Sequence, residues 1–244
     1  MKKLFTRVFF GICAFGTSAL AFAQEVAPIE GESMHQALKT KFIEGSPDFM
    51  SLVAIVLILG LAFVLERIIY LNLADINPNK MLKDIEFALD KGDVEEAKQI
   101  ARNTRGPIAS IAFQGLLRID QGIDVVEKSV VSYGGVQGGL LEKNLSWVTL
   151  FIAMAPSLGF LGTVIGMILA FDTIERVGDI SPTVVAGGMK VALITTVGGL
   201  VVALILQVFY NYLLSKLEGI LNKMEDASIT LLDMVIKYNV KYKR

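Results

Sequence analysis

Cysteine, histidine and charge inside the apolar segments are almost absent from this chain of 244 residues. The one cysteine, Cys13, lies in an apolar segment near the N-terminus, and the one histidine, His35, lies in a polar segment that follows. The rest of the chain therefore has no thiol for a disulfide or a cysteine metal site. We interpret His35 as a solvated loop residue and expect no metal site. The net charge of −1 gives no indication of a nucleic-acid surface.

Motifs for enzymatic chemistry are missing as well. The sequence contains no glycine-rich phosphate-binding loop ending in Gly-Lys-Ser/Thr, which nucleotide hydrolysis commonly uses. No carboxylate of the polar region between the first two long apolar segments is accompanied by a histidine or a cysteine. We find no nucleophile–base pair and no cluster of metal ligands. We therefore predict that the protein is not an enzyme and uses no cofactor.

Long apolar segments are what the sequence does have, and hydrophobic residues make up 53% of it. A helix needs roughly 20 apolar residues to cross a bilayer. Three segments reach about that length, and the third contains Lys190 near its beginning. None carries Asp, Glu, Lys, Arg or His in its middle. The expected spans are 49–71, 146–171 and 182–210.

The first residues resemble a secretory signal peptide. Lys2, Lys3 and Arg7 precede a short apolar stretch, and Ala21-Phe22-Ala23 fits an A-x-A cleavage site before Gln24. We expect cleavage; the alternative is an additional uncleaved anchor. Both interpretations place residue 24 outside the cytoplasm.

The basic residues give the orientation. Ten Lys and Arg lie in 67–143 and six lie after Tyr210, whereas Lys39, Lys41 and Arg176 are on the opposite side. Because cytoplasmic loops carry the excess of basic residues, 67–143 and the C-terminus are predicted to be cytoplasmic. The expected segments are a signal peptide (1–23), an extracytoplasmic tail (24–48), a first span (49–71), a cytoplasmic helical domain (72–145), a second span (146–171), a short turn (172–181), a third span (182–210) and a cytoplasmic C-terminal helix (211–244). The fold class is an all-α membrane protein with three transmembrane helices and a small helical domain between the first two.

Small and hydroxylic residues recur along one face of each of the last two spans. The second span carries Gly159, Gly162, Thr163, Gly166 and Ala170, and Pro156 is expected to bend it. The third span carries Gly188, Ala192, Thr195 or Thr196, Gly199 and Ala203. Such faces allow close helix contact. Helix packing without any transport is the simpler explanation for the glycines alone.

Three threonines, Thr163, Thr195 and Thr196, are expected near mid-membrane depth on those faces. A threonine can hide its hydroxyl on the carbonyl four residues back, whereas several converging hydroxyls can line a narrow, water-holding path. A proton relay normally needs an ionisable side chain in the membrane, and these spans have none at their centre. If protons move here, a partner chain must supply the titrating group.

Two motifs in the spans are similar to those of the MotA/TolQ/ExbB proton-channel family. The first is Ala155-Pro156-x-x-Gly159-x-x-Gly162-Thr163-Val164-x-Gly166. The second is Ala192-Leu193-Ile194-Thr195-Thr196-x-Gly198-Gly199-Leu200, followed by Tyr210-Asn211. The likeness covers about residue 48 to the C-terminus. Three spans and one cytoplasmic domain resemble the ExbB and TolQ branches, with ExbB the closer, more than the four-span MotA branch.

The resemblance implies a pentamer around two copies of a single-span partner, ExbD-like or TolR-like, whose membrane Asp carries the proton. It implies that Thr163 and Thr196 face that Asp. It also implies a bacterial inner membrane, a periplasmic N-terminus and a TonB-like protein through which the proton gradient drives outer-membrane transport. A TolQ-like role in envelope maintenance and a non-conducting scaffold are the alternatives.

One position departs from the family pattern. Many ExbB proteins carry Glu just before the Ala-Leu-Ile run, where this chain has Val191 preceded by Lys190. No role of that Glu can be transferred. We favour Lys190 as an interfacial residue; the alternative is that it tunes the field at the entrance of the pathway.

Overall fold

The computed structural model describes residues 34–178 and 182–242. The chain divides into two units, 1–43 and 44–244. Helix α2 (Met34–Glu44) contributes the described residues of the first unit. The expected signal peptide and its cleavage site lie outside the described residues.

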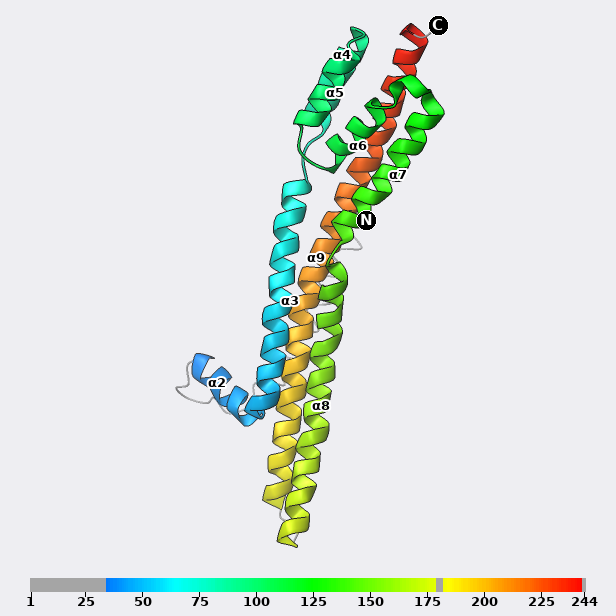
Figure 1. Cartoon of the computed structure of the whole chain (residues 1–244). Coiled ribbons are helices and arrows are strands. Elements are labelled where there is room, and N and C mark those ends of the chain that lie inside the picture. The colour runs from blue at the N-terminus through cyan, green and yellow to red at the C-terminus, as the bar shows by residue number, and fades with distance from the viewer. Residues whose placement is uncertain (1–33, 179–181, 243–244) are drawn as a thin grey trace, which may run out of the picture. The chain divides into compact units, whose positions relative to one another are not determined.

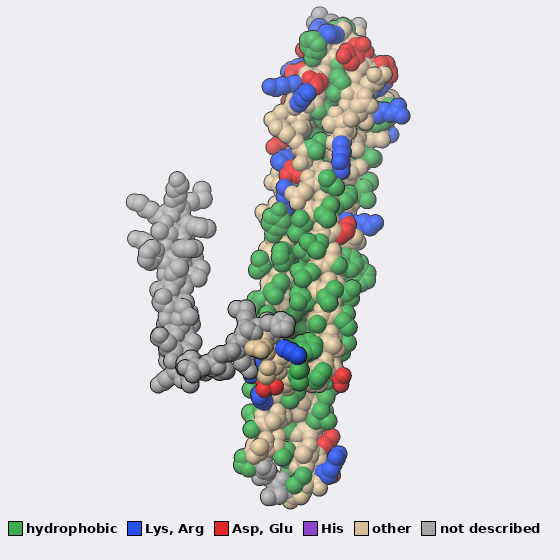
Figure 2. All heavy atoms as spheres, turned by 90° about the vertical axis from the view of Figure 1, so that its left-hand side faces the viewer, with side chains coloured by type: hydrophobic (Ala, Val, Ile, Leu, Met, Phe, Trp, Pro, Cys, Tyr) green, Lys and Arg blue, Asp and Glu red, His purple; other side chains and the backbone are tan. Residues whose placement is uncertain are grey.

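Three long helices lie side by side in the second unit: α3 (Pro47–Ala74), α8 (Leu145–Val177) and α9 (Pro182–Tyr242) (Figure 1). Each is long and apolar enough to cross a membrane. The described residues contain no strand. The expected all-α fold with three membrane-crossing helices is confirmed. Figure 2 shows hydrophobic side chains over the middle of the face that it draws, with charged ones mostly gathered beyond the end of α3.

Two glycine contacts set the register of α3 along α9. Gly60 of α3 faces Leu206, and Gly198 of α9 faces Met50. A residue of α3 is therefore level with the α9 residue about 147 positions later, and the two helices run parallel. Helix α8 runs antiparallel to α9, because Gly159 lies against Gly199 while Gly166 lies against Ala192.

The shorter helices pack at one end of this bundle. They are α4 (Asn79–Asp90), α5 (Val94–Asn103), α6 (Pro107–Leu116), the 3-10 turn η1 (Ile119–Gln121) and α7 (Ile123–Glu142). Asp93 caps α5, since its carboxylate accepts the N–H of Glu96 at 2.9 Å. Helix α4 begins at Asn79, and the side chain of Asn77 accepts that residue's N–H at 3.0 Å. The cytoplasmic location of these helices remains a prediction.

Two helices are longer than the sequence suggested. Helix α9 continues past Tyr210 without a break, because its buried face repeats at steps of three and four from Leu213 to Leu231. Helix α8 continues through the expected turn to Val177, because only Gly178, with φ +73°, ends it. The remaining residues of that turn, 179–181, lie outside the described residues.

Candidate functional site

Helices α8 and α9 approach each other at glycines. A methyl group added at Gly159 would stand 2.9 Å from the carbonyl oxygen of Thr195, and one at Gly162 would stand 2.8 Å from that residue's hydroxyl. A methyl group at Gly199 would overlap the carbonyl oxygen of Ala155, and one at Gly166 would lie 3.3 Å from the backbone nitrogen of Ala192. The four glycines chosen from the sequence therefore lie in one contact, where three of them face backbone atoms and Gly162 faces the side chain of Thr195.

Two of the three threonines meet across this contact. The hydroxyls of Thr163 in α8 and Thr196 in α9 are hydrogen-bonded to each other. Both lie within reach of the same two carbonyl oxygens: those of Gly159 and Ala192 are 3.2 Å from Thr163 Oγ1, and 3.4 and 3.3 Å from Thr196 Oγ1. Each hydroxyl therefore has three acceptors within reach: the other hydroxyl and the two carbonyl oxygens. Each hydroxyl has acceptors both in its own helix and in the other helix. The hydroxyls can therefore exchange partners without losing all hydrogen bonds.

Thr195 lies differently. Its side chain is fully buried, and its hydroxyl donates to the carbonyl of Ala192 at 2.8 Å. The side chain fills the space beside Gly162. The structure therefore separates Thr195, which packs inside the helix contact, from Thr163 and Thr196, which are only partly buried.

The threonine pair lies on the side of α9 away from α3. Successive residues of a helix are about 100° apart, so Thr196 is about 160° around α9 from Gly198. Gly198 is the residue that contacts Met50 of α3. A companion helix could therefore approach Thr163 and Thr196 without displacing α3.

The axial position of the pair can be given relative to the charged residues at the two ends of the spans. Thr196 is six residues, or about 9 Å, from the level of Lys190. Arg67, at the other charged end, is level with about residue 214 of α9, roughly 27 Å away from Thr196. The sum, about 36 Å, is enough to cross a bilayer core of about 30 Å. Between these charged levels the threonines lie in the third nearer Lys190, and their depth in the membrane remains a prediction.

Pro156 lies inside α8, which continues through it as one helix. Proline has no N–H, so the carbonyl of Ile152 loses its usual partner in the helix. Ile152 is 11 residues, or about three turns of helix, before Thr163.

Lys190 pairs with an acid outside the threonine contact. Its Nζ is 2.6 Å from Glu44 Oε1, just before α3 begins. Six residues correspond to about 120° around the helix, so Lys190 and Thr196 project from different faces. This geometry supports the interfacial interpretation of Lys190. The side chain of Val191, at the position where relatives carry Glu, is half-buried.

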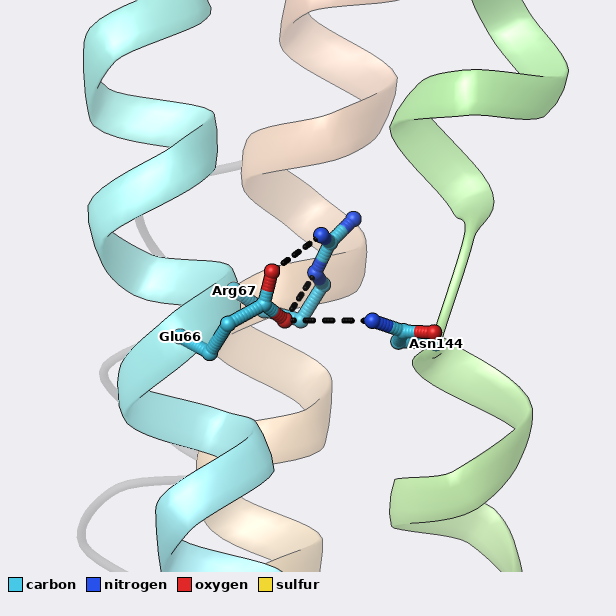
Figure 3. Close-up of polar contacts among 3 residues, drawn as sticks. All are labelled: Glu66, Arg67 and Asn144. Carbon is cyan, nitrogen blue, oxygen red and sulfur yellow. Dashed lines mark hydrogen bonds and ion pairs between the residues drawn. The ribbon is translucent and has the colours of Figure 1, made fainter.

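A second polar cluster lies at the other end of the spans (Figure 3). Nε of Arg67 donates to Glu66 Oε2 at 2.7 Å, its Nη2 also donates to Glu66, and Asn144 Nδ2 donates to Oε2 at 3.4 Å. The guanidinium lies over the ring of Tyr70, 4.5 Å from its centre, and the side chain is 4% exposed. Its Nη1 has no hydrogen-bond partner among the described residues.

Asn144 was missed by sequence reasoning. Its backbone φ is +68°, and helix α7 ends and helix α8 begins on either side of it. Helix α9, in contrast, continues as one helix past the same level. Asparagine tolerates this left-handed conformation better than most residues. An asparagine just before an apolar segment was the one signal that could have identified the joint.

Among the residues that the structure describes, no group of His, Cys, Asp and Glu could hold a metal ion. The arrangement between α8 and α9 is instead that of a neutral, hydrogen-bonded contact inside a membrane bundle. Its hydroxyls and carbonyls donate and accept hydrogen bonds, and none of these groups is an acid or a base at ordinary pH.

Comparisons with known proteins identify relatives of this chain. The family model described as "MotA/TolQ/ExbB proton channel family" matches residues 103–226. A putative biopolymer transport protein ExbB homolog of Methanothermobacter thermautotrophicus is 29% identical over 175 residues, which are 71% of this chain and 62% of that protein. Biopolymer transport protein exbB1 of Vibrio cholerae is 34% identical over 108 residues, 37% of this chain and 47% of that protein. Biopolymer transport protein ExbB of Aquifex aeolicus is 35% identical over 78 residues, 32% of this chain and 53% of that protein.

The chain spans about half to three fifths of the length of these relatives. The family match covers both threonines of the α8–α9 contact, the glycines around them and the joint at Asn144. It extends over about half of the 244 residues. The chain therefore belongs to the MotA/TolQ/ExbB proton channel family.

Proposed function

We propose that this chain is the proton-channel subunit of an inner-membrane motor that uses the proton gradient to energise outer-membrane transport. The observation that carries the proposal is the hydroxyl pair of Thr163 and Thr196. It lies between two closely packed helices whose middle parts have no ionisable residue. Family membership and relatives named biopolymer transport proteins support the same function.

The chemistry follows from what the bundle lacks. A proton needs a titrating group in the membrane, and this chain offers only alcohols and backbone carbonyls between its charged ends. We propose that a single-span partner, ExbD-like or TolR-like, presents an Asp to the face of α9 turned away from α3. The hydroxyls of Thr163 and Thr196 donate to that carboxylate when it is charged, and they return to the carbonyls of Gly159 and Ala192 when it is protonated.

The remaining assignments are part of the same proposal. The N-terminal tail and the segment 172–181 are periplasmic, and the α4–α7 helices and the end of α9 are cytoplasmic. Five copies surround two copies of the partner, and a TonB-like protein receives the motion. One charge that crosses 100 mV releases roughly 2.3 kcal/mol, so a few protons per step are sufficient to break a protein contact.

A test replaces single threonines in the complex that this chain forms with a single-span protein carrying a membrane Asp, reconstituted into vesicles. Thr163→Val and Thr196→Val are expected to reduce gradient-driven proton flux, followed with a pH-sensitive dye inside the vesicles. Thr149→Val is the matched control, because Thr149 is an exposed α8 threonine that back-bonds to Leu145 at 3.3 Å. All three variants are expected to assemble.

The competing functions predict different results. A non-conducting scaffold predicts that both pathway variants assemble and behave like wild type. A TolQ-like role in envelope maintenance predicts the same loss of flux but a different protein at the receiving end. Co-purification of a TonB-like or a TolA-like chain separates those two.

A further inference from the structure

A small cavity lies beside the last turn of α3, away from the threonine contact. Its volume is about 240 Å³. Tyr70 and Leu73 of α3 line one side of it, Arg105 and Ser110 line the side at the beginning of α6, and Gln137 of α7 closes it. The cavity therefore lies at the junction of a membrane-crossing helix with the shorter helices.

The lining favours an anion. It offers a guanidinium, two hydroxyls and an amide, and no carboxylate belongs to it. Arg105 is exposed and takes part in no ion pair or hydrogen bond recorded for residues 34–178 and 182–242. Glu66, one turn before Tyr70, is the acid of the same helix face, and Arg67 neutralises it. A basic residue without a partner in a cavity free of acids attracts a phosphate.

The position of the cavity along α3 indicates that the phosphate belongs to a lipid headgroup. Tyr70 is one turn beyond Arg67, at the depth where tyrosines mark the membrane interface. An exposed apolar stripe begins at the cavity and follows α3 toward the middle of the bundle. Its members are Leu73 (49% exposed), Ile69 (60%), Leu65 (58%) and Ile58 (66%). These residues are spaced at four, four and seven positions, so they share one face of the helix.

We propose that this cavity binds the phosphate of an anionic phospholipid whose acyl chains lie along the Leu73–Ile58 stripe of α3. Arg105 pairs with the phosphate, and Gln137 and the hydroxyl of Tyr70 are within the lining to donate hydrogen bonds, whereas the Ser110 hydroxyl donates to the carbonyl of Gly106 at 3.2 Å. A free phosphate ion would use the same donors but would leave the apolar stripe unoccupied. The site requires only that the bundle lie in a bilayer, so it stands apart from the proposed proton pathway.

The single tryptophan of the chain allows a direct test. Trp147 is 49% exposed and stacks on Phe63 of α3, with 5.9 Å between the ring centres. Phe63 is seven residues before Tyr70, about 10 Å along the helix, which is the depth of acyl chains rather than headgroups. A lipid held at the cavity therefore brings its chains to the depth of Trp147, on the face of α3 next to the one that carries Phe63, which lies about 125° around the helix from the middle of the stripe.

The experiment uses the full-length oligomer in phosphatidylcholine vesicles that contain a fixed fraction of phosphatidylglycerol. Either the phosphatidylglycerol or the same fraction of phosphatidylcholine carries brominated chains, which quench tryptophan fluorescence. We expect brominated phosphatidylglycerol to be enriched about fivefold at Trp147, the size expected for one basic residue near an anionic surface. Arg105→Gln is expected to remove this excess, whereas Arg102→Gln, the same charge change at an exposed arginine outside the cavity, is expected to keep it.

Equal quenching by the two lipids, or an excess that survives Arg105→Gln, overturns the proposal. A further arm adds inorganic phosphate at constant ionic strength. If millimolar phosphate abolishes the excess, the cavity binds the free ion, and the proposal is overturned. Quenching needs neither a proton gradient nor a partner chain. A negative result here therefore leaves the proton-pathway test unaffected, and the converse also holds.

Discussion

The two polar regions of the membrane bundle differ in how they accommodate polar groups. Between α8 and α9 the groups are neutral hydroxyls, and each has a carbonyl acceptor within 3.4 Å. At the Arg67 end the groups are charged, one guanidinium donor has no partner among the described residues, and the neighbouring helix is broken at Asn144. Neutral hydroxyls fit into a tight helix contact because the backbone supplies their acceptors. The charged groups of Glu66 and Arg67 instead pair with each other, at a level where helices α7 and α8 are not continuous.

The largest expected effect comes from adding a methyl group to the tight region. Gly199→Ala places a carbon against the carbonyl of Ala155 and is expected to cost about 3 kcal/mol of bundle stability, because backbone cannot move aside as a side chain can. Gly219→Ala, on the same helix with open space around it, is expected to gain about 0.5–1 kcal/mol. Unfolding of the oligomer in denaturing detergent, followed by circular dichroism, measures both. Equal effects of the two variants would show that α8 and α9 are not in backbone contact.

A smaller effect is expected where the charged region is disturbed. Glu66→Ala leaves the buried guanidinium of Arg67 without its acceptor and is expected to cost about 2 kcal/mol. Arg67→Met also removes the donor that already lacks a partner, so its cost should be clearly lower. The same unfolding assay orders the two variants. If Arg67→Met proves the more damaging, the guanidinium makes a favourable contact that the Glu66 pair does not explain.

The smallest effect is expected outside the membrane, at Asp75. Hydrogen bonds from Lys216 and then Lys223 hold the pKa of this carboxyl below its usual value of 3.8. Because the folded pKa is lowered, the stabilisation is complete above the unfolded value and is lost as pH falls through the folded one. Asp75→Asn should therefore lower stability by less than about 1 kcal/mol, since such pairs are partly solvated.

That difference is expected to stay constant between pH 5 and pH 8 and to vanish in strong acid. Denaturant titrations of both proteins across this range measure it. A difference that changes near neutral pH would mean that a group other than Asp75 titrates there.

Much of this molecule follows from its sequence, and the reasons for success and failure are physical. The spans could be predicted because apolar length is a strong local signal, and the α8–α9 contact because small residues repeat at helical spacing. The register of α3 along α9 could not be predicted, since it depends on long-range packing at Met50 and Gly60. The continuity of α9 past Tyr210 was missed because aromatic residues mark a membrane interface without ending a helix. The different surroundings of Thr195 and Thr196 could not be predicted, because they depend on how α9 is rotated about its axis. A span with many small residues does not determine that rotation.

Proton flux through the oligomer, with and without its single-span partner, tests the central claim most directly. The claim is that this chain contributes hydroxyls to a pathway whose acid belongs to another chain. The account predicts no gradient-driven flux into vesicles that hold this chain alone, flux when the partner is present, and a loss of that flux in Thr163→Val and Thr196→Val. Proton flux through the oligomer alone, or unchanged flux through the complex without both hydroxyls, would contradict it.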